Sequence, residues 1–364
     1  MTTPATTPAT TPAEAAATAA APAPTDAPVP SGHEMPRTVS ALVFVRDRGI
    51  FILWGLLIAF FAVWCSPYFF TTDNAILVAN AGALTALFAA GVGIGVMTGV
   101  LDLSLPGTAA FASCVCGYLL THGAGTWVGL AAGVACGVVV GLVNGFIALR
   151  GFNPIIITIG TLSVLSGLAA VVAGGYTFPG LTQLEFMGTH RYFNVPAPVY
   201  VVAVVYVVGT VFLTRTRDGI RLMAVGGNAE AVRRAGIHSA RYTVLGFVIS
   251  GILASLGGLV STAVVTEANP AASPAIIFTA LTAVALAGVS LTGGRGSLPR
   301  VLVGALILAT ISNGLTIRGI QPYWATVVTG ALLLGSLLFE RVIQTSVSNR
   351  LMATANLSVH QKKV

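Results

Sequence analysis

The stretch Thr214–Tyr242 reads TRTRDGIRLMAVGGNAEAVRRAGIHSARY and interrupts a chain that is otherwise almost continuously hydrophobic. Its six arginines are Arg215, Arg217, Arg221, Arg233, Arg234 and Arg241. An arginine at the centre of a bilayer costs about 2.5–3.5 kcal/mol in insertion measurements, so this stretch must lie in water. Short loops rich in arginine and lysine stay on the cytoplasmic side. The stretch therefore predicts a cytoplasmic element between membrane-spanning helices.

The composition indicates a membrane protein. Of the 364 residues, 55% are hydrophobic and only 8% are charged, whereas an ordinary soluble domain carries roughly 25% charged residues. The formal net charge is +7, but the cations are scattered in short loops without interleaved aromatic residues. That distribution is not typical of a nucleic-acid-binding surface. We therefore expect an all-α fold, a polytopic helical bundle in the membrane, and no nucleic-acid partner.

The residue types that usually carry catalysis or metal binding form no pattern here. The cysteines lie in apolar runs without zinc or disulfide spacing, and the five histidines are far apart. The only lysines are Lys362 and Lys363, so the phosphate-binding loop GxxxxGK[ST], which needs an internal lysine, is excluded. We expect no catalytic residue, no metal and no cofactor in this chain, and no ATP hydrolysis by that route.

The chain divides into three parts. Residues 1–40 contain three TTPA repeats and further Ala, Pro and Thr tracts, which predict a disordered cytoplasmic tail. Residues 41–341 are expected to form the membrane domain, and residues 342–364 a cytoplasmic C-terminal tail. About ten apolar segments are long enough to cross the hydrocarbon of a bilayer. They lie near residues 49–65, 75–97, 104–121, 126–149, 154–175, 198–214, 242–264, 275–292, 299–316 and 322–339.

The positions of the cations test this topology. With both termini in the cytoplasm, only Arg191 and Arg318 of the 18 lysine and arginine residues fall on the external side. An excess of cations in cytoplasmic loops is the known bias of membrane proteins. We therefore expect both termini to be cytoplasmic.

The cytoplasmic stretch also carries the signals of a short helix. Asn228 is a good N-cap, and Glu230 falls in the positively polarised first turn. Arg233 and Arg234 fall near the negative end, and Gly236 favours a C-terminal stop. A shaped helix is therefore predicted, although an ordinary basic loop that only fixes orientation is the alternative.

The segment MTGVLDLSLPG, residues 97–107, places a carboxylate in an apolar stretch. Gly99 and Pro106 favour a broken helix at this point. An ionisable group within the membrane suggests a functional role, here at the lining or gate of a solute path. Alternatively, Asp102 caps the next helix by accepting hydrogen bonds from backbone amides, and Ser104 shares that role.

Other polar residues within the spans bond neighbouring helices or contact a hydroxylated solute. With Asp102 and Ser104, we assign four of them to a translocation path or gate: Asn144, Asn153, Thr158 and Thr161. Glycines at every fourth position from Gly129 to Gly145 predict close packing of that span against another helix. The sequence GGRGSLPR at Gly293–Arg300 predicts a tight cytoplasmic turn and, without a lysine, no phosphate site.

Several segments together resemble the permease subunits of ABC importers for ribose, xylose, arabinose and related simple sugars. The resemblance rests on their order and covers most of residues 50–341. The segments are DLS at Asp102–Ser104, GLVNGFIALRGFNPIIITIGTLSVLSGLA at Gly141–Ala169, RTRDGIRLMAVGGNAEAVRRAGI at Arg215–Ile237, ALAGVSLTGGRGSLPRVLVGALIL at Ala285–Leu308, and a last span ending at Glu340 and Arg341.

The resemblance implies a multi-pass protein of the bacterial inner membrane, surrounded by lipid. It implies a homodimer with a second permease copy, a cytoplasmic ATPase subunit that binds ATP and Mg, and an extracytoplasmic sugar-binding protein. It also implies that the cytoplasmic helix couples the ATPase to the spans. The coupling residues would be Arg215, Arg217, Gly226, Gly227, Asn228, Glu230, Ala231, Arg233 and Gly236.

One departure and two alternatives remain. The run VLDLSLPG replaces the GGIDLSVG-like run of many relatives, which leaves the sugar and the local gate geometry open. An ion-coupled secondary transporter is the alternative function, but it normally needs acidic or histidine relays, and only Asp102 is available. A membrane enzyme would need a set of facing catalytic groups that the sequence does not supply.

Overall fold

The computed structural model describes residues 37–290 and 292–361. The chain forms two units, residues 1–42 and residues 43–364. Of the first unit, the structure describes only the beginning of helix α1, so most of the predicted tail 1–40 lies outside the described residues. All other described elements belong to the second unit, which contains the predicted sites.

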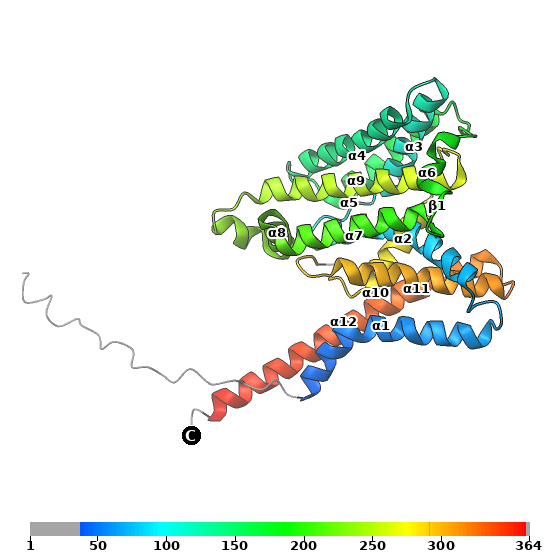
Figure 1. Cartoon of the computed structure of the whole chain (residues 1–364). Coiled ribbons are helices and arrows are strands. Elements are labelled where there is room, and N and C mark those ends of the chain that lie inside the picture. Colours follow the sequence, from blue (N-terminus) through cyan, green and yellow to red (C-terminus); the bar gives the residue numbers. More distant parts are fainter. Residues whose placement is uncertain (1–36, 291, 362–364) are drawn as a thin grey trace, which may run out of the picture. The chain divides into compact units, whose positions relative to one another are not determined.

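The described residues are almost entirely helical, which confirms the all-α fold (Figure 1). The long helices are α1 (Arg37–Trp64), α2 (Thr72–Met97), α3 (Leu105–Thr121), α4 (Thr126–Ala148), α5 (Pro154–Val172), α7 (Ala197–Arg215), α8 (Arg217–Arg234), α9 (Ser239–Val265), α10 (Ala275–Leu286), α11 (Leu298–Ile317) and α12 (Pro322–Gln361). Between α5 and α7 lie η1 (Thr182–Leu184), α6 (Glu185–Gly188) and a small antiparallel pair, β1 (Arg191–Tyr192) and β2 (Val195–Pro196).

Seven helices are long and apolar enough to cross a membrane, counted over the described residues. They are α2, α4, α5, α7, α9, α11 and the Pro322–Val342 part of α12. Three shorter apolar helical segments are Arg48–Trp64, Leu105–Thr121 and Ala275–Leu286. The chain is therefore a multi-pass membrane protein with a helical bundle.

Helix α10 ends earlier than the span expected near residues 275–292. The last helical residue is Leu286, and Gly288 follows with φ +65, a left-handed conformation that favours glycine. The N–H of Val289 donates to the carbonyl oxygen of Val284 at 3.3 Å, which closes the helix end. Residues 289–290 and 292–297 lie between this helix end and the start of α11.

The glycine-rich helix α4 packs along α9, and Figure 1 shows the two side by side. A Cβ atom added to Gly137 would overlap the carbonyl oxygen of Gly251, and one added to Gly141 would lie 2.5 Å from the Cα atom of Val248. The two backbones therefore touch without intervening side chains. The predicted role of the glycine stripe in helix packing is confirmed.

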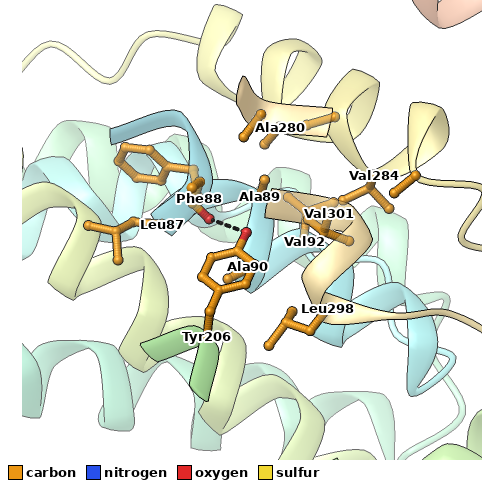
Figure 2. Packing of buried hydrophobic residues seen from close by; sticks show 14 of the residues in the cluster. Leu87, Phe88, Ala89, Ala90, Val92, Tyr206, Ala280, Val284, Leu298 and Val301 are labelled. Carbon is orange, nitrogen blue, oxygen red and sulfur yellow. Dashed lines mark hydrogen bonds between the residues drawn. The ribbon is translucent and has the colours of Figure 1, made fainter. Parts of the chain in front are cut away.

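Helix α2 occupies the centre of the hydrophobic core. Its residues Leu87, Ala89 and Ala90 are fully buried, and Figure 2 shows them between side chains from α7, α10 and α11. The hydroxyl of Tyr206 on α7 donates a hydrogen bond of 3.0 Å to the carbonyl oxygen of Ala86 (Figure 2). This bond satisfies a buried phenol that would otherwise be costly in hydrocarbon. The middle of α2 is thus held by several neighbouring helices.

The predicted break between the second and third spans is confirmed. Helix α2 ends at Met97, Gly99 has φ +80, and α3 begins at Leu105 with Pro106 in its first turn. Proline is favourable there because the first helical amides have no partner within the helix. Residues 98–104 therefore form a non-helical segment that leads from α2 into α3.

Candidate functional site

Helix α8 consists of two helical parts separated at Asn228, whose backbone has φ −163 and ψ 93. The side-chain Oδ1 atom of Asn228 accepts a hydrogen bond of 2.9 Å from the N–H of Ala231. This is the geometry of an N-cap, in which a side chain satisfies one of the free amides at the start of a helix. The predicted cap is confirmed, and a second, short helix begins after Asn228.

The short helix ends as predicted at Gly236, which has φ +81. The N–H of Gly236 donates to the carbonyl oxygen of Arg233 at 3.0 Å, and the N–H of Ile237 donates to that of Val232 at 3.2 Å. This pair of bonds is a Schellman motif, which closes a helix where a glycine adopts the left-handed conformation. We call residues 228–236 the loop helix.

The loop helix presents an exposed ion-pair cluster. The Glu230 carboxylate lies 2.6 Å from Arg233 Nη2 and 3.0 Å from Arg234 Nε. Hydrogen bonds from Arg234 and then Arg233 hold the pKa of Glu230 below its ordinary value. The side chains of Arg233 and Arg234 remain 69% and 80% exposed, so they are accessible to another protein.

Gly226, which lies just before the loop helix, packs against the end of α2. A Cβ atom on Gly226 would overlap the carbonyl oxygen of Met97 and lie 2.8 Å from the Cα atom of Thr98. Conversely, a Cβ atom on Gly99 would lie 3.1 Å from the Cα atom of Gly226. Any larger residue would push the two backbones apart. Gly226 of the GGN segment therefore has a steric reason to be glycine, whereas a Cβ atom on Gly227 would lie 3.5 Å from the Cα atom of Gly294, an ordinary contact distance.

The turn between α10 and α11 completes this contact. Gly293 and Gly294 both have positive φ angles, +87 and +72. A Cβ atom on Gly293 would overlap the carbonyl oxygen of Gly226, and one on Gly294 would overlap the Cα atom of Gly227. The N–H of Gly294 donates to the carbonyl oxygen of Met97 at 2.9 Å. We call this meeting of three chain segments the glycine junction, formed by Gly99, Gly226, Gly227, Gly293 and Gly294.

The start of α8 is tied to the start of α9. The hydroxyl of Tyr242 donates to Asp218 Oδ1 at 2.9 Å, and Arg221 Nη1 lies 3.5 Å from the same hydroxyl oxygen. Tyr242 is only 2% exposed. Figure 1 places α8 at the ends of α7 and α9. The first part of α8, which leads into the loop helix, is thus joined to the bundle through α9 as well as through the glycine junction.

The remaining predicted coupling residues are Arg215, Arg217 and Ala231. All three are exposed, two of them on either side of the α7–α8 turn and one on the loop helix. The hydroxyl oxygen of Thr216, between the two arginines, caps α8 by accepting from the N–H of Gly219 at 3.0 Å. The predicted coupling residues therefore lie on α8 and the turns that flank it.

A second site is a buried hydrogen-bond network at Asp102. Its Oδ1 atom accepts from the backbone N–H of Ser104 at 2.9 Å and from the Ser104 hydroxyl at 2.6 Å. Its Oδ2 atom accepts from the hydroxyl of Ser250 on α9 at 2.9 Å. Asp102 is 2% exposed, and no ion pair to it is found within the described ranges. Hydrogen bonds thus take the place of a countercharge.

The network continues into α4 and α5. The Asn144 side-chain Nδ2 atom donates to the Ser104 hydroxyl oxygen at 3.1 Å. The Thr161 hydroxyl in turn donates to Asn144 Oδ1 at 2.6 Å. Each donor in this chain points toward Asp102. We call Asp102, Ser104, Asn144, Thr161 and Ser250 the Asp102 network, which joins the 98–104 segment to three helices.

Two of the predicted path residues lie outside this network. Asn153 caps α5 by accepting from the N–H of Ile155 at 2.9 Å. Thr158 is buried and donates to the carbonyl oxygen of Pro154 at 2.9 Å, within its own helix. The structure therefore brings together Asp102, Ser104, Asn144 and Thr161 and not the other two. A role for all six residues in a path or gate stays a prediction.

Ser250 is the network member that sequence reasoning missed. It lies in the apolar run GFVISGIL of α9, where a lone serine is indistinguishable from the other small residues of a membrane helix. Asp102 accepts from the backbone N–H of Ser104, the N-cap residue of α3, but no described side chain caps the free amides of this helix, so the predicted capping role of Ser104 is wrong. Among the described residues, no group of three or more His, Cys, Asp and Glu is placed to hold a metal ion.

The fold defines a multi-pass helical membrane protein. The family described as "Branched-chain amino acid transport system / permease component" matches residues 74–337, and the chain belongs to this family. The glycine junction, the loop helix and the Asp102 network all lie within the matched residues.

Individual relatives agree with this assignment. The L-arabinose transport system permease protein of Escherichia coli K12 is 31% identical over 86% of this chain and 96% of its own length. The ribose import permease protein of Bacillus subtilis 168 is 32% identical over 76% and 87%. The D-allose transport system permease protein of Escherichia coli K12 is 29% identical over 83% and 93%. The resemblance to sugar permeases is confirmed.

Proposed function

We propose that this chain is the membrane-spanning subunit of an ATP-driven importer for a simple sugar, a pentose or a hexose. A separate cytoplasmic ATPase subunit binds ATP and Mg and supplies the energy. The observation that carries the proposal is the loop helix, which is capped at both ends, exposed, and joined to the end of α2 through the glycine junction.

A helix of this kind suits a coupling element. Fixing the orientation of a membrane protein needs only positive charge. The loop helix has in addition an N-cap, a Schellman stop and an exposed cluster of Glu230, Arg233 and Arg234. A cleft in the ATPase that received this surface would move the loop helix when it closed. The glycine junction would pass the displacement to Met97 and the 98–104 segment.

The proposed function also implies a membrane topology. Ten spans arise when the three shorter apolar segments cross the membrane together with the seven long ones. Both termini and the loop helix then lie in the cytoplasm of a bacterium, with the permease domain at residues 41–341 in the inner membrane. The tails 1–40 and 342–364 are cytoplasmic in this arrangement, although α12 continues through Gln361.

The partners follow from the relatives. Permeases named for arabinose, ribose and allose support a simple sugar as the substrate. The sugar is delivered by an extracytoplasmic binding protein, and a second copy of the permease completes the path across the lipid bilayer. Pentose and hexose hydroxyls require the same donors and acceptors, so the choice between them rests mainly with the binding protein.

Reconstitution tests the proposal against an ion-coupled transporter. The permease is placed in lipid vesicles with a candidate ATPase subunit and a candidate sugar-binding protein, and uptake of labelled ribose, arabinose and allose is measured. We expect uptake only with ATP, both partners and a sugar. Uphill uptake by the permease alone, driven by a proton or sodium gradient, would contradict the proposal.

A further inference from the structure

Two neighbouring cavities lie between α2, the end of α9 and the start of α10. Their volumes are about 280 Å³ and 130 Å³, and Phe88, Ser261 and Ile276 line both. Pockets for drug-sized ligands measure about 300–1,000 Å³, so these two suit a smaller solute. They lie outside the Asp102 network and contain none of its members.

The larger cavity combines an aromatic face with hydroxyl groups. Phe88 on α2 packs against Gly257 of α9, where an added Cβ atom would lie 2.9 Å from the ring, so the ring position is fixed. The hydroxyls of Thr85 and Thr279 donate to carbonyl oxygens in their own helices, which leaves their oxygens able to accept. The Ser261 hydroxyl makes no hydrogen bond within residues 37–290 and 292–361, so it is available to a ligand.

The smaller cavity adds a carboxylate and an amide from the segment that links α9 and α10. Glu267 and Asn269 both line it. Asn269 Oδ1 accepts from the N–H of Ala271 at 2.8 Å, which orients the amide and leaves its N–H₂ donors available. The Glu267 carboxylate has no ion-pair partner in the described part of the chain.

This linking segment is held in place by backbone contacts. Ala268 and Phe178 exchange two hydrogen bonds of 2.9 and 3.0 Å, and the N–H of Leu181 donates to the carbonyl oxygen of Thr266 at 2.9 Å. Thr266 itself has φ +54, a conformation rarely adopted by residues other than glycine. The positions of Glu267 and Asn269 are therefore determined by the fold and not by a free loop.

These groups match the chemistry of a sugar ring. A furanose or pyranose has a face of C–H groups and an edge of hydroxyls that both donate and accept. A carboxylate accepts from such hydroxyls, an amide N–H₂ donates to them, and an aromatic ring packs on the C–H face. Sites for small molecules combine an apolar wall with a few placed polar groups in this way.

We propose that Phe88, Ser261, Glu267 and Asn269 form the contact site at which the permease receives its sugar on the path across the membrane. Glu267 and Asn269 bind hydroxyls, and Phe88 covers the C–H face. The proposal rests on the function proposed above. It assigns selectivity to the permease itself, beyond the selection made by the binding protein.

Transport by the reconstituted complex provides the first measurement. We expect Glu267→Gln and Asn269→Ala each to lower sugar uptake about tenfold, the usual effect of losing a hydrogen bond to a charged or buried group, and to change the ratio of ribose to allose uptake. The ATPase rate without sugar should not change. Glu185→Gln is the matched control, because this exposed carboxylate of α6 lies outside both cavities. Unchanged uptake and unchanged sugar ratios in both variants would overturn the proposal.

A binding measurement separates this site from the proposed function. Asn269→Cys is made in the purified full chain and labelled with a membrane-impermeant maleimide, after size-exclusion chromatography has shown that the variant is folded. Millimolar ribose or allose should slow labelling several-fold, while leucine should not. If sugar protects the cysteine but the complex shows no ATP-driven uptake, the proposed contact site is supported and the proposed ATP-driven function is contradicted. Protection by leucine alone, or by no solute, would overturn the site.

Discussion

The N–H of Gly294 donates a hydrogen bond of 2.9 Å to the carbonyl oxygen of Met97. These residues are nearly two hundred positions apart in the sequence, yet this bond joins the turn before α11 to the last residue of α2. Gly226 lies against the same carbonyl oxygen. Three segments therefore meet at one point, next to the break that leads to Asp102.

Gly226→Ala should disrupt the glycine junction. The added methyl group would overlap the carbonyl oxygen of Met97, and overpacking of this kind costs about 1–3 kcal/mol. We expect assembled protein with a lower Tm and a loss of sugar-stimulated ATP hydrolysis of about tenfold. Gly160→Ala on α5 is the control, because no atom lies within 4 Å of its added Cβ. Normal stimulation in Gly226→Ala would show that the junction does not transmit the motion.

Asn228→Ala should loosen the loop helix by removing its N-cap. Loss of a cap costs about 1 kcal/mol, and the helix is too short to tolerate it. We expect weaker binding of the ATPase subunit in pull-down measurements, with unchanged membrane insertion. Asn228→Ser should restore binding because serine is also a good cap. If the alanine and serine variants bind equally well, capping is not what shapes this surface.

Glu230→Gln should weaken ATPase binding through loss of the ion pairs to Arg233 and Arg234. The pKa of Glu230 is below its ordinary value of 4.5, so the contribution of its charge is complete above that value. It is lost only as the pH falls through the lower pKa of the folded protein. The difference between Glu230→Gln and the wild type should therefore be the same at about pH 6 and pH 8. A difference that disappears by pH 6 would contradict this ion-pair assignment.

Asp102→Leu should destabilise the folded protein, so that it unfolds or does not assemble. The change leaves the Ser104 amide, the Ser104 hydroxyl and the Ser250 hydroxyl without a partner, at about 1–3 kcal/mol for each buried donor. Asp102→Asn keeps the shape and one acceptor oxygen, and should have a Tm closer to that of the wild type. A wild-type Tm in Asp102→Leu would rule out a structural network.

The asparagine variant also separates the two roles of Asp102. If the carboxylate acts at a path or gate, Asp102→Asn should lose more sugar uptake than its lower Tm and its lower yield of assembled protein account for. Parallel loss of stable protein and of transport would favour the capping role. The measurements are uptake per assembled complex and thermal stability by light scattering.

The features predicted correctly are those with a local cause. Seven of the apolar spans, the N-cap at Asn228, the stop at Gly236 and the break after Gly99 each depend on residues within a few positions of one another. The glycine stripe from Gly129 to Gly145 likewise predicts close packing, because small residues at every fourth position share one helix face. Such signals can be read before any tertiary contact is known.

The features missed are those that depend on partners far away in the chain. Nothing in GFVISGIL distinguishes Ser250 as the partner of Asp102, and nothing local indicates that Gly293 meets Gly226. Six polar residues were assigned to one path, but Asn153 and Thr158 bond only to their own segment. A side chain's partner is decided by the packing of whole helices, which periodicity alone does not determine.

The contact between Gly137 and Gly251 has a mechanical consequence. Because α4 and α9 touch through their backbones, a movement of α9 that kept this contact would carry α4 with it. Ser250 lies beside Gly251 and Tyr242 lies at the near end of the same helix. A displacement of α9 that started at the α8–α9 corner would therefore also move Ser250, whose hydroxyl donates to the Asp102 carboxylate.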